Sequence, residues 1–217
     1  FFMRKARLLI VVLLLAAVML NSACGILAGG EQKAQEQNAY ERIQQTLTGL
    51  TSYRCMATVE YKANKGSNSY ETVQHGRITG EYRIEVVAPE KVAGSVTCSD
   101  GSKIYQFSTQ VNGRVSLLAK ETQERSEIFL TSFIKNYMRS QEVSVSVANL
   151  GEGKCTVLEA VIPGGHPYLS SEKLWMDNET FKPVQLIIYD PEGKERIVVT
   201  YSTVEYNVEL DDALFTV

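Results

Sequence analysis

The sequence has little of the chemistry that enzymes and nucleic-acid-binding proteins use. Its two histidines, His75 and His166, lie in polar, turn-rich stretches and belong to no metal-binding motif such as H-E-x-x-H. It has no G-x-S-x-G elbow, no P-loop and no G-x-G-x-x-G motif. Lysine and arginine form no run or patch after the first residues, which argues against nucleic acid as a partner. We therefore expect a binding protein without a cofactor, a metal or catalytic residues.

The longest hydrophobic run lies near the N-terminus and is too short to span a membrane. Residues 8–20 are 13 apolar residues in a row, whereas crossing the hydrocarbon layer takes roughly 20. Three basic residues precede the run within residues 4–7, and small residues follow it at 21–25. A basic flank, a short apolar core and a small-residue cut site predict a secretion signal over residues 1–23.

The cysteine at the cut site indicates which kind of signal this is. Ser22-Ala23-Cys24 resembles the bacterial lipobox, in which the cysteine is diacylated and becomes the first residue of the mature protein. That pattern prefers leucine where Asn21 stands, and Leu20 lies one position too early. The alternative is ordinary cleavage that leaves Cys24 unmodified. We expect the lipoprotein: an exported protein held by two acyl chains to the outer face of a bacterial membrane.

Removal of the signal leaves a mature chain suited to one domain. Its 194 residues can bury a sizeable core, and its formal charge changes from −3 to −6. Three further cysteines, Cys55, Cys98 and Cys155, are far apart and form no C-x-x-C pair. Each lies in a strand-like run, where a reduced cysteine packs as a small apolar residue. One disulfide, such as Cys55–Cys98, is the alternative.

The hydrophobic periodicity predicts two helices and a series of strands. Residues 24–37 are interpreted as a flexible tether, followed by a helix over 38–48 and the rest of one domain over 38–217. A second helix is predicted over 122–140, with Glu121 and Glu124 near its N-terminal end. Alternating polar and apolar residues predict strands at 53–61, 69–76, 78–86, 93–99, 102–109, 114–119, 143–149 or 154–162, 171–177, 183–190 and 194–206.

This order of elements predicts an α+β fold, with both helices on one face of a curved antiparallel sheet. The second helix has a wide apolar face made by Ile128, Phe129, Leu130, Phe133, Ile134, Tyr137 and Met138. We expect Ile128, Leu130, Phe133, Ile134 and Tyr137 to plug the inner wall of the sheet. Because that face is wide, we also expect a small or closed cavity.

One β-strand and the turn that follows it contain a tryptophan and an acidic cluster. Trp175 lies on a strand with its ring opposite to Leu174 and Met176, which suggests packing under a helix, although it is the aromatic residue best placed to contact a partner. Asp177-Asn178-Glu179 resembles a calcium loop only faintly and is interpreted as a hairpin turn.

The layout of the chain resembles the LolA/LolB/RseB-like superfamily. The resemblance lies in the lipobox, the leading helix that ends in Leu50-Thr51-Ser52-Tyr53, the stretch Ser99-Asp100-Gly101-Ser102-Lys103-Ile104-Tyr105 and the middle helix. It covers nearly all of residues 38–217 with diffuse motifs. It implies an unclosed β-barrel, or half-barrel, with amphipathic helices across its concave face, and a capacity to bind lipid or acylated protein.

The C-terminal third is similar to the GerS-like germination lipoproteins of clostridia. The similar stretches are Val161-Ile162-Pro163-Gly164, Lys173-Leu174-Trp175-Met176-Asp177, Lys182-Pro183-Val184, Ile188-Tyr189-Asp190, Tyr206-Asn207 and Leu214-Phe215. The resemblance implies a non-catalytic lipoprotein of the forespore or spore envelope. It also implies a complex with a CwlD-type amidase that modifies the spore cortex for germination, and a strand-exchanged homodimer.

Three functions follow from these observations. The first is a membrane-anchored partner or activator of a cortex-modifying N-acetylmuramoyl-L-alanine amidase. The second is an envelope lipoprotein that binds a lipid or lipoprotein in an apolar cavity. The third, a hydrolase with unfamiliar residues, would require ionisable groups that converge in a cleft.

Overall fold

The computed structural model describes residues 33–110, 114–118, 125–164 and 168–216. The predicted signal over residues 1–23, the lipidation site Cys24, and His166, Glu121 and Glu124 lie outside the described residues.

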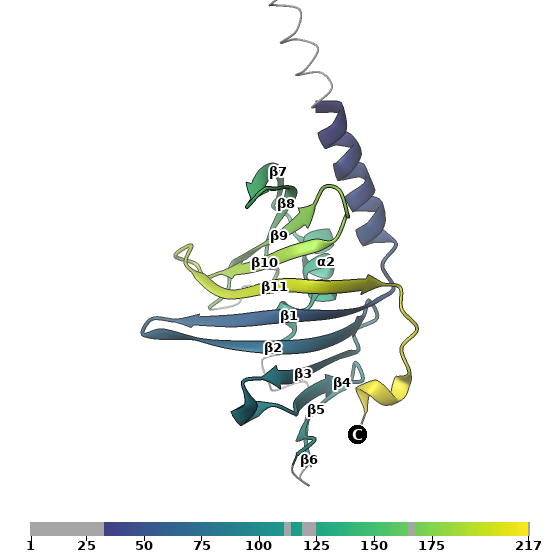
Figure 1. The fold of residues 1–217 in the computed structure, drawn as a ribbon, viewed down its shortest axis with the longest axis vertical. Helices are drawn as coiled ribbons and strands as arrows, with labels where there is room; N and C mark the ends of the chain where they lie inside the picture. The colour runs from purple at the N-terminus through teal and green to yellow at the C-terminus, as the bar shows by residue number, and fades with distance from the viewer. Residues whose placement is uncertain (1–32, 111–113, 119–124, 165–167, 217) are drawn as a thin grey trace, which may run out of the picture.

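Within the described residues, eleven strands form one antiparallel sheet in the order β6-β5-β4-β3-β2-β1-β11-β10-β9-β8-β7 (Figure 1). The strands are β1 (Ser52–Ala63), β2 (Gly66–Arg77), β3 (Tyr82–Ala88), β4 (Ser95–Ser99), β5 (Lys103–Ser108), β6 (Arg114–Leu118), β7 (Val143–Leu150), β8 (Gly153–Val161), β9 (Ser171–Asp177), β10 (Pro183–Tyr189) and β11 (Glu195–Tyr206). Two meanders thus meet where β1 pairs with β11, from Tyr53↔Tyr206 to Tyr61↔Ile197. The edge strands β6 and β7 do not pair with each other, so the half-barrel is unclosed.

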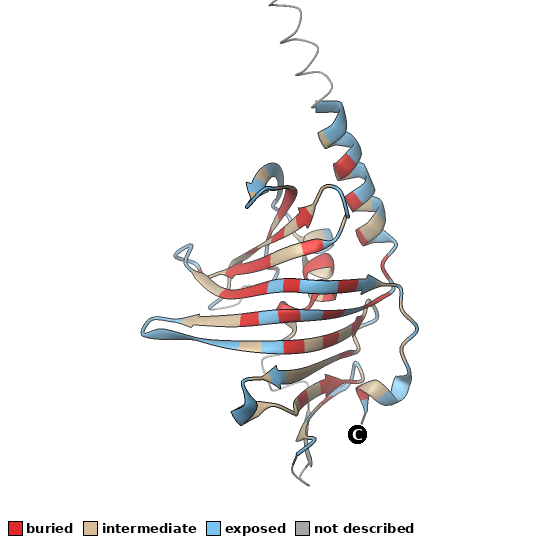
Figure 2. Cartoon of the chain, in the orientation of Figure 1, coloured by how far each residue is buried: buried red, intermediate tan, exposed pale blue. Residues whose placement is uncertain are grey.

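The strands form where the sequence alternates, and the alternation assigns the two faces of the sheet. In β1 the side chains of Tyr53, Cys55 and Val59 are buried, whereas those of Arg54 and Met56 are exposed. Figure 2 shows this as red and blue bands along the central strands. The buried set faces the helices, as the period of two requires.

The tight turns lie where the sequence predicts them. At the β10–β11 turn, Asp190 Oδ1 accepts hydrogen bonds from the backbone N–H groups of Glu192 and Lys194, each 2.9 Å long. Gly193 in this turn has a φ of 76°, a conformation that favours glycine. The stretches 143–149 and 154–162 were predicted as alternatives, and both are strands: they form the β7–β8 hairpin, which turns at Gly151.

Two helices cover the concave face of the sheet. The N-terminal helix occupies residues 33–48, so it includes the last five residues of the predicted tether. In Figure 1 it leads away from the start of β1. The other, α2 (Leu130–Arg139), follows the 3-10 helix η2 (Arg125–Ile128) and lies behind β10, β11 and β1 in this view.

The single helix predicted over 122–140 is wrong in its extent. Phe129 between η2 and α2 has an extended backbone, with φ −90° and ψ 138°, and this interrupts the helix. The apolar face of α2 is also narrower than predicted, since Met138 is 58% exposed. Two short 3-10 helices, η1 (Glu90–Val92) and η3 (Asp212–Phe215), complete the fold.

The main core lies between the helices and the strands around the β1–β11 seam. Its members include Ile43 and Leu47 of the N-terminal helix, Phe133 of α2, and Leu174 and Leu186 of the sheet. Cys55, Cys98 and Cys155 are buried with free thiols, which confirms the packing interpretation over a Cys55–Cys98 disulfide. Among the described helices, none combines the length and the hydropathy needed to cross a bilayer.

Candidate functional site

An open hollow of about 760 Å³ lies on the concave face beside the main core. Its lining comes mainly from β1–β5, and Ile128 and Phe129 form its wall nearest α2. The volume falls within the range of about 300–1,000 Å³ that is typical of small-molecule sites. The lining residues are Val59, Tyr61, Asn68, Tyr70, Thr72, Tyr82, Ile84, Val86, Val92, Ser95, Val96, Thr97, Gln106, Phe107, Ser108, Ile128 and Phe129.

The prediction of a small or closed cavity is therefore wrong. The apolar side chains expected to plug the sheet are in place: Ile128, Leu130, Phe133 and Ile134 are buried, and Tyr137 is half-buried. They pack into the main core, and α2 has ten residues and not the nineteen expected, of which 122–124 lie outside the described residues. Of the five predicted plug residues, Ile128 also lines the hollow.

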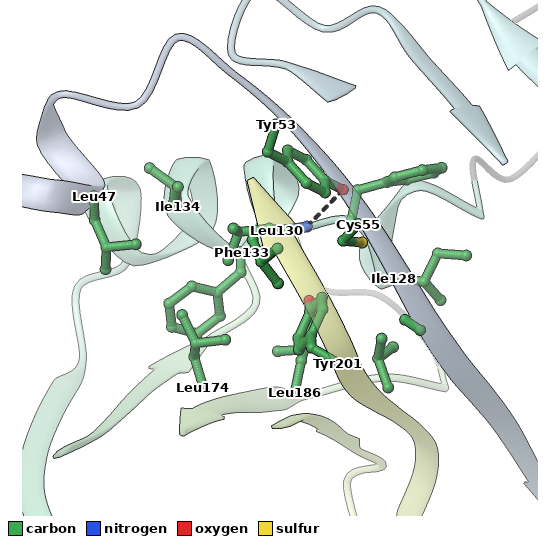
Figure 3. Packing of buried hydrophobic residues seen from close by; sticks show 14 of the residues in the cluster. Leu47, Tyr53, Cys55, Ile128, Leu130, Phe133, Ile134, Leu174, Leu186 and Tyr201 are labelled. Atoms are coloured by element: carbon green, nitrogen blue, oxygen red, sulfur yellow. Dashed lines mark hydrogen bonds between the residues drawn. The ribbon is translucent and has the colours of Figure 1, made fainter. Parts of the chain in front are cut away.

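The junction between the hollow and the core is held by aromatic residues. Phe129 packs against Tyr82 of β3, with ring centroids 4.5 Å apart. The backbone N–H of Leu130, at the start of α2, donates a 3.2 Å hydrogen bond to Tyr53 Oη of β1 (Figure 3). No side chain of the helix caps this end, so the strand supplies the acceptor that the first turn needs. Burial raises the pKa of the Tyr53 hydroxyl well above its ordinary value.

Beneath α2 lies a buried carboxyl group, Glu172 of β9. The residue is 0% exposed, and among the described residues no donor lies in hydrogen-bonding position to either carboxylate oxygen. Burial raises its pKa to about 8, and Glu127 adds to the rise while the nearby Asn136 amide opposes it. At neutral pH the group is therefore mostly uncharged. Glu172 was not among the residues predicted to matter, although the period of two groups it with Leu174 and Met176, which face the core.

Trp175, the predicted partner contact, lies on the opposite, convex face of β9. It pairs with Val157 of β8 and Gln185 of β10, whereas Leu174 faces the core beside Leu158 and Leu186. Trp175 therefore does not pack beneath α2, contrary to our expectation. The residue is half-buried, and its indole N–H is shielded from solvent without a hydrogen-bond acceptor among the described residues.

The remaining ionisable residues form no recognisable reactive centre in the described part of the chain. There, no three His, Cys, Asp or Glu side chains gather so as to hold a metal ion. Asp177 Oδ1 accepts hydrogen bonds from the backbone N–H groups of Glu179 and Thr180, which confirms the turn interpretation. His75 of β2 is half-buried, and burial lowers its pKa, with Arg83 and Arg54 contributing.

A second, polar hollow of about 620 Å³ lies at the other side of α2. Its lining includes Glu127, Lys135 and Arg139, together with backbone-rich loops near Gly80 and Gly164. It mixes charges of both signs and has no buried, unpaired group in its lining. The apolar hollow therefore remains the better candidate for a ligand site.

The sequence matches the family described as sporulation protein YdcC-like over residues 5–215. A comparison with curated protein sequences finds no match.

Several solved structures are similar to this chain. The GerS lipoprotein of Clostridioides difficile, solved in complex with the CwlD amidase, is 29% identical, with 79% of this chain and 95% of that chain covered and a TM-score of 0.48. A LolA superfamily protein from Nitrosomonas europaea is 14% identical, with coverages of 83% and 96% and a TM-score of 0.45. The Mycobacterium tuberculosis lipoprotein LppX is 15% identical, with coverages of 80% and 97% and a TM-score of 0.44.

Proposed function

The chain belongs to the family of YdcC-like sporulation proteins, and from this premise we propose that it is a non-catalytic lipoprotein that binds and activates a cell-wall amidase. The amidase is of the N-acetylmuramoyl-L-alanine type and modifies the spore cortex for germination. The protein is anchored through Cys24 to the outer face of a membrane of the forespore or spore envelope.

The observation on which this proposal depends is the family match, because it spans almost the whole chain and assigns the protein to sporulation. The partner class is inferred from the sequence resemblance to the GerS family in the C-terminal third. That resemblance includes the stretch around Trp175, which forms much of β9. GerS itself was solved in complex with an amidase.

The convex face around Trp175 is the surface that we propose for the amidase. Val157, Ile187 and Val198 lie on this face at 5%, 6% and 7% exposure. Trp175 lies beside them, and its indole N–H has no acceptor in the part of the chain that the structure describes. A small rotation of the indole on binding would give this donor a partner oxygen, and aromatic residues of this kind are frequent hot spots of interfaces.

The test is co-purification of the full chain with its amidase, followed by measurement of amidase activity on peptidoglycan. We expect one complex and a higher amidase rate. Trp175→Ala should weaken the complex at least tenfold, whereas Met56→Ala, an exposed change elsewhere on the convex face, should leave it intact. If amidase and lipoprotein elute separately and the rate is unchanged, the proposal is wrong.

The hollow of about 760 Å³ favours a second candidate function, namely binding of an acyl chain or lipid by an envelope lipoprotein. Native mass spectrometry of the protein from detergent-free extracts should then detect a bound lipid. Ile84→Trp, which fills the hollow from β3, should abolish binding. Val87→Trp, at an exposed position of the same strand that does not line the hollow, is the matched control. A hollow that retains no lipid under any extraction excludes this function.

A further inference from the structure

The valines of β7 form an exposed apolar stripe on the concave side of the sheet. Val143, Val145 and Val147 are 49%, 43% and 38% exposed, although they belong to a regular strand. The residues that stand opposite them on β8 are all buried: Ala160, Leu158 and Thr156. The apolar side of the sheet therefore continues one strand beyond the part that the rest of the described chain covers.

The two sides of β7 differ in polarity. Residues 143–150 contain no ionisable side chain. Ser144 and Ser146 alternate with the valines and therefore face the other side, where Ser144 donates a hydrogen bond to Glu159 of β8. An exposed apolar patch of this kind marks a contact with a protein or with a membrane. Which of the two it is depends on where β7 lies relative to the proposed anchor.

The N-terminal helix begins beside β7. Glu36, in its first turn, forms an ion pair with Lys154 next to the β7–β8 turn, with Oε1 and Nζ 2.7 Å apart. In Figure 1 the start of this helix and β7 both lie at the upper end of the molecule, and β6 lies at the lower end. Of the two edges of the sheet, β7 is therefore the one beside the segment that leads to Cys24.

That segment is short compared with the sheet. Eight residues, 25–32, separate Cys24 from Lys33, and a chain of this length reaches about 30 Å when fully extended. The eleven strands, spaced about 4.8 Å apart, extend over roughly 48 Å along the sheet. Acyl chains on Cys24 therefore bring the β7 end of the sheet, rather than the β6 end, to the bilayer surface.

We propose that the valine stripe of β7 rests on the bilayer in which Cys24 is anchored. This inference rests on the lipid anchor of the proposed function, and it adds the orientation of the domain and the residues that contact lipid. Because the stripe lies on the concave side, the convex face around Trp175 stays open to the amidase.

The contact with the bilayer is shallow. No described strand pairs with the outer side of β7, so backbone N–H and C=O groups on that side need water as a partner, which the hydrocarbon layer does not supply. The strand therefore lies at the level of the lipid headgroups. Only the valine side chains reach the boundary of the acyl chains.

Quenching by a spin-labelled lipid tests this orientation. The full acylated chain is reconstituted into vesicles of phosphatidylcholine and phosphatidylglycerol, with one cysteine at a time introduced over residues 143–147 and labelled with a fluorophore. Cys55, Cys98 and Cys155 are buried, and the native chain measures their background. A nitroxide near the glycerol end of the lipid acyl chains should quench labels at the three valine positions roughly threefold more than labels at the two serine positions.

Three further variants serve as controls. Val87→Cys on β3, where Val87 is 41% exposed, should be quenched no more than the serine positions. Val145→Asp should lower the quenching at Val147→Cys to that same level, because a carboxylate is costly at the acyl boundary. Ser146→Asp, on the polar side of β7, should leave the quenching at Val147→Cys unchanged.

Flotation of the same vesicles distinguishes the stripe from the anchor. A chain that floats with the vesicles but is quenched equally at valine and serine positions overturns the contact of β7 with lipid and leaves the anchor in place. A chain that does not float excludes the anchor itself. Labels on the stripe that lipid does not quench, but that added amidase shields from iodide, would also overturn the proposal and make β7 a protein interface.

Discussion

Glu172 is a single buried residue that makes the stability of the fold depend on pH. The carboxyl is fully buried between Ala160 and Ile188 on neighbouring strands, and α2 covers it. A charged carboxylate without partners in such a place is costly, so the group retains its proton instead. Its pKa is raised from 4.5 to about 8, mainly by burial.

This raised pKa predicts a stability that falls as pH rises. Between about pH 4.5 and 8 the unfolded chain has lost the proton that the folded chain keeps. Each unit of rising pH therefore lowers the free energy of unfolding by up to about 1.4 kcal/mol. The stability that the folded chain gains by keeping the Glu172 proton is fully present below pH 4.5 and is lost by about pH 8. Glu172→Gln should remove this slope and be more stable than the native chain at pH 8, by roughly 3–5 kcal/mol at most.

Urea unfolding at pH 5 and pH 8 measures this difference. Glu152→Gln, an exposed change in the β7–β8 turn, should leave the pH dependence as it is in the native chain. Identical slopes for Glu172→Gln and the native chain would show that Glu172 is not protonated in the fold.

Tyr53 is a second residue with a role of its own, because its hydroxyl oxygen accepts a hydrogen bond from the first N–H of α2. Tyr53→Phe should cost about 1–3 kcal/mol of unfolding free energy, because a buried N–H would lose its partner. Tyr70→Phe at the rim of the hollow should cost less than about 0.5 kcal/mol, since surface changes usually do. Thermal unfolding of both variants decides the matter, and equal losses would contradict the capping role.

At the scale of elements, a few side chains hold α2 on the concave face of the sheet. Leu130 and Phe133 are 0% exposed, and the Phe133 ring stacks on Tyr137 with centroids 5.7 Å apart. Leu174 and Leu186 of the sheet belong to the same core cluster. The helix is therefore held mainly by packing, as short helices usually are.

Phe133→Ala should lower the free energy of unfolding by about 3–5 kcal/mol, because it leaves a cavity beneath the helix. Met138→Ala, on the exposed side of the same helix, should change it by no more than about 0.5 kcal/mol. Chemical unfolding of the two variants compares them directly. A loss below about 1 kcal/mol for Phe133→Ala would mean that α2 does not plug the sheet.

At the scale of the whole molecule, the half-barrel separates three surfaces. The hollow opens over β1–β5, the proposed amidase surface lies on the convex side of β8–β11, and β7 forms one edge. Because they involve different residues, the three proposals can be tested by separate substitutions.

The proposed anchor is a property of the whole chain. Cys24→Ala should move the protein from the membrane fraction to the soluble fraction. Two acyl chains hold a protein durably at a membrane, and the variant has no site to which they could be attached. Circular dichroism should show the same fold in both forms. A native chain that is already soluble, with an unmodified thiol at Cys24, would exclude the lipoprotein.

The sequence by itself predicted the strands, because alternation with a period of two is a local property. It also predicted the tight turn at Asp190–Gly193, since aspartate and glycine at those positions have local geometric roles. The apolar residues Leu130, Phe133 and Ile134 were expected in the core for the same reason, as one face of a helix must be buried.

The tertiary structure decided what depends on contacts between distant segments. The break at Phe129 makes α2 begin only at Leu130, and it occurs where Phe129 meets Tyr82 of another strand. The burial of Glu172, the convex position of Trp175 and the free edge of β7 all follow from which strands lie beside which. Strand order and helix placement depend on pairings across the whole chain, and local periodicity does not contain that information.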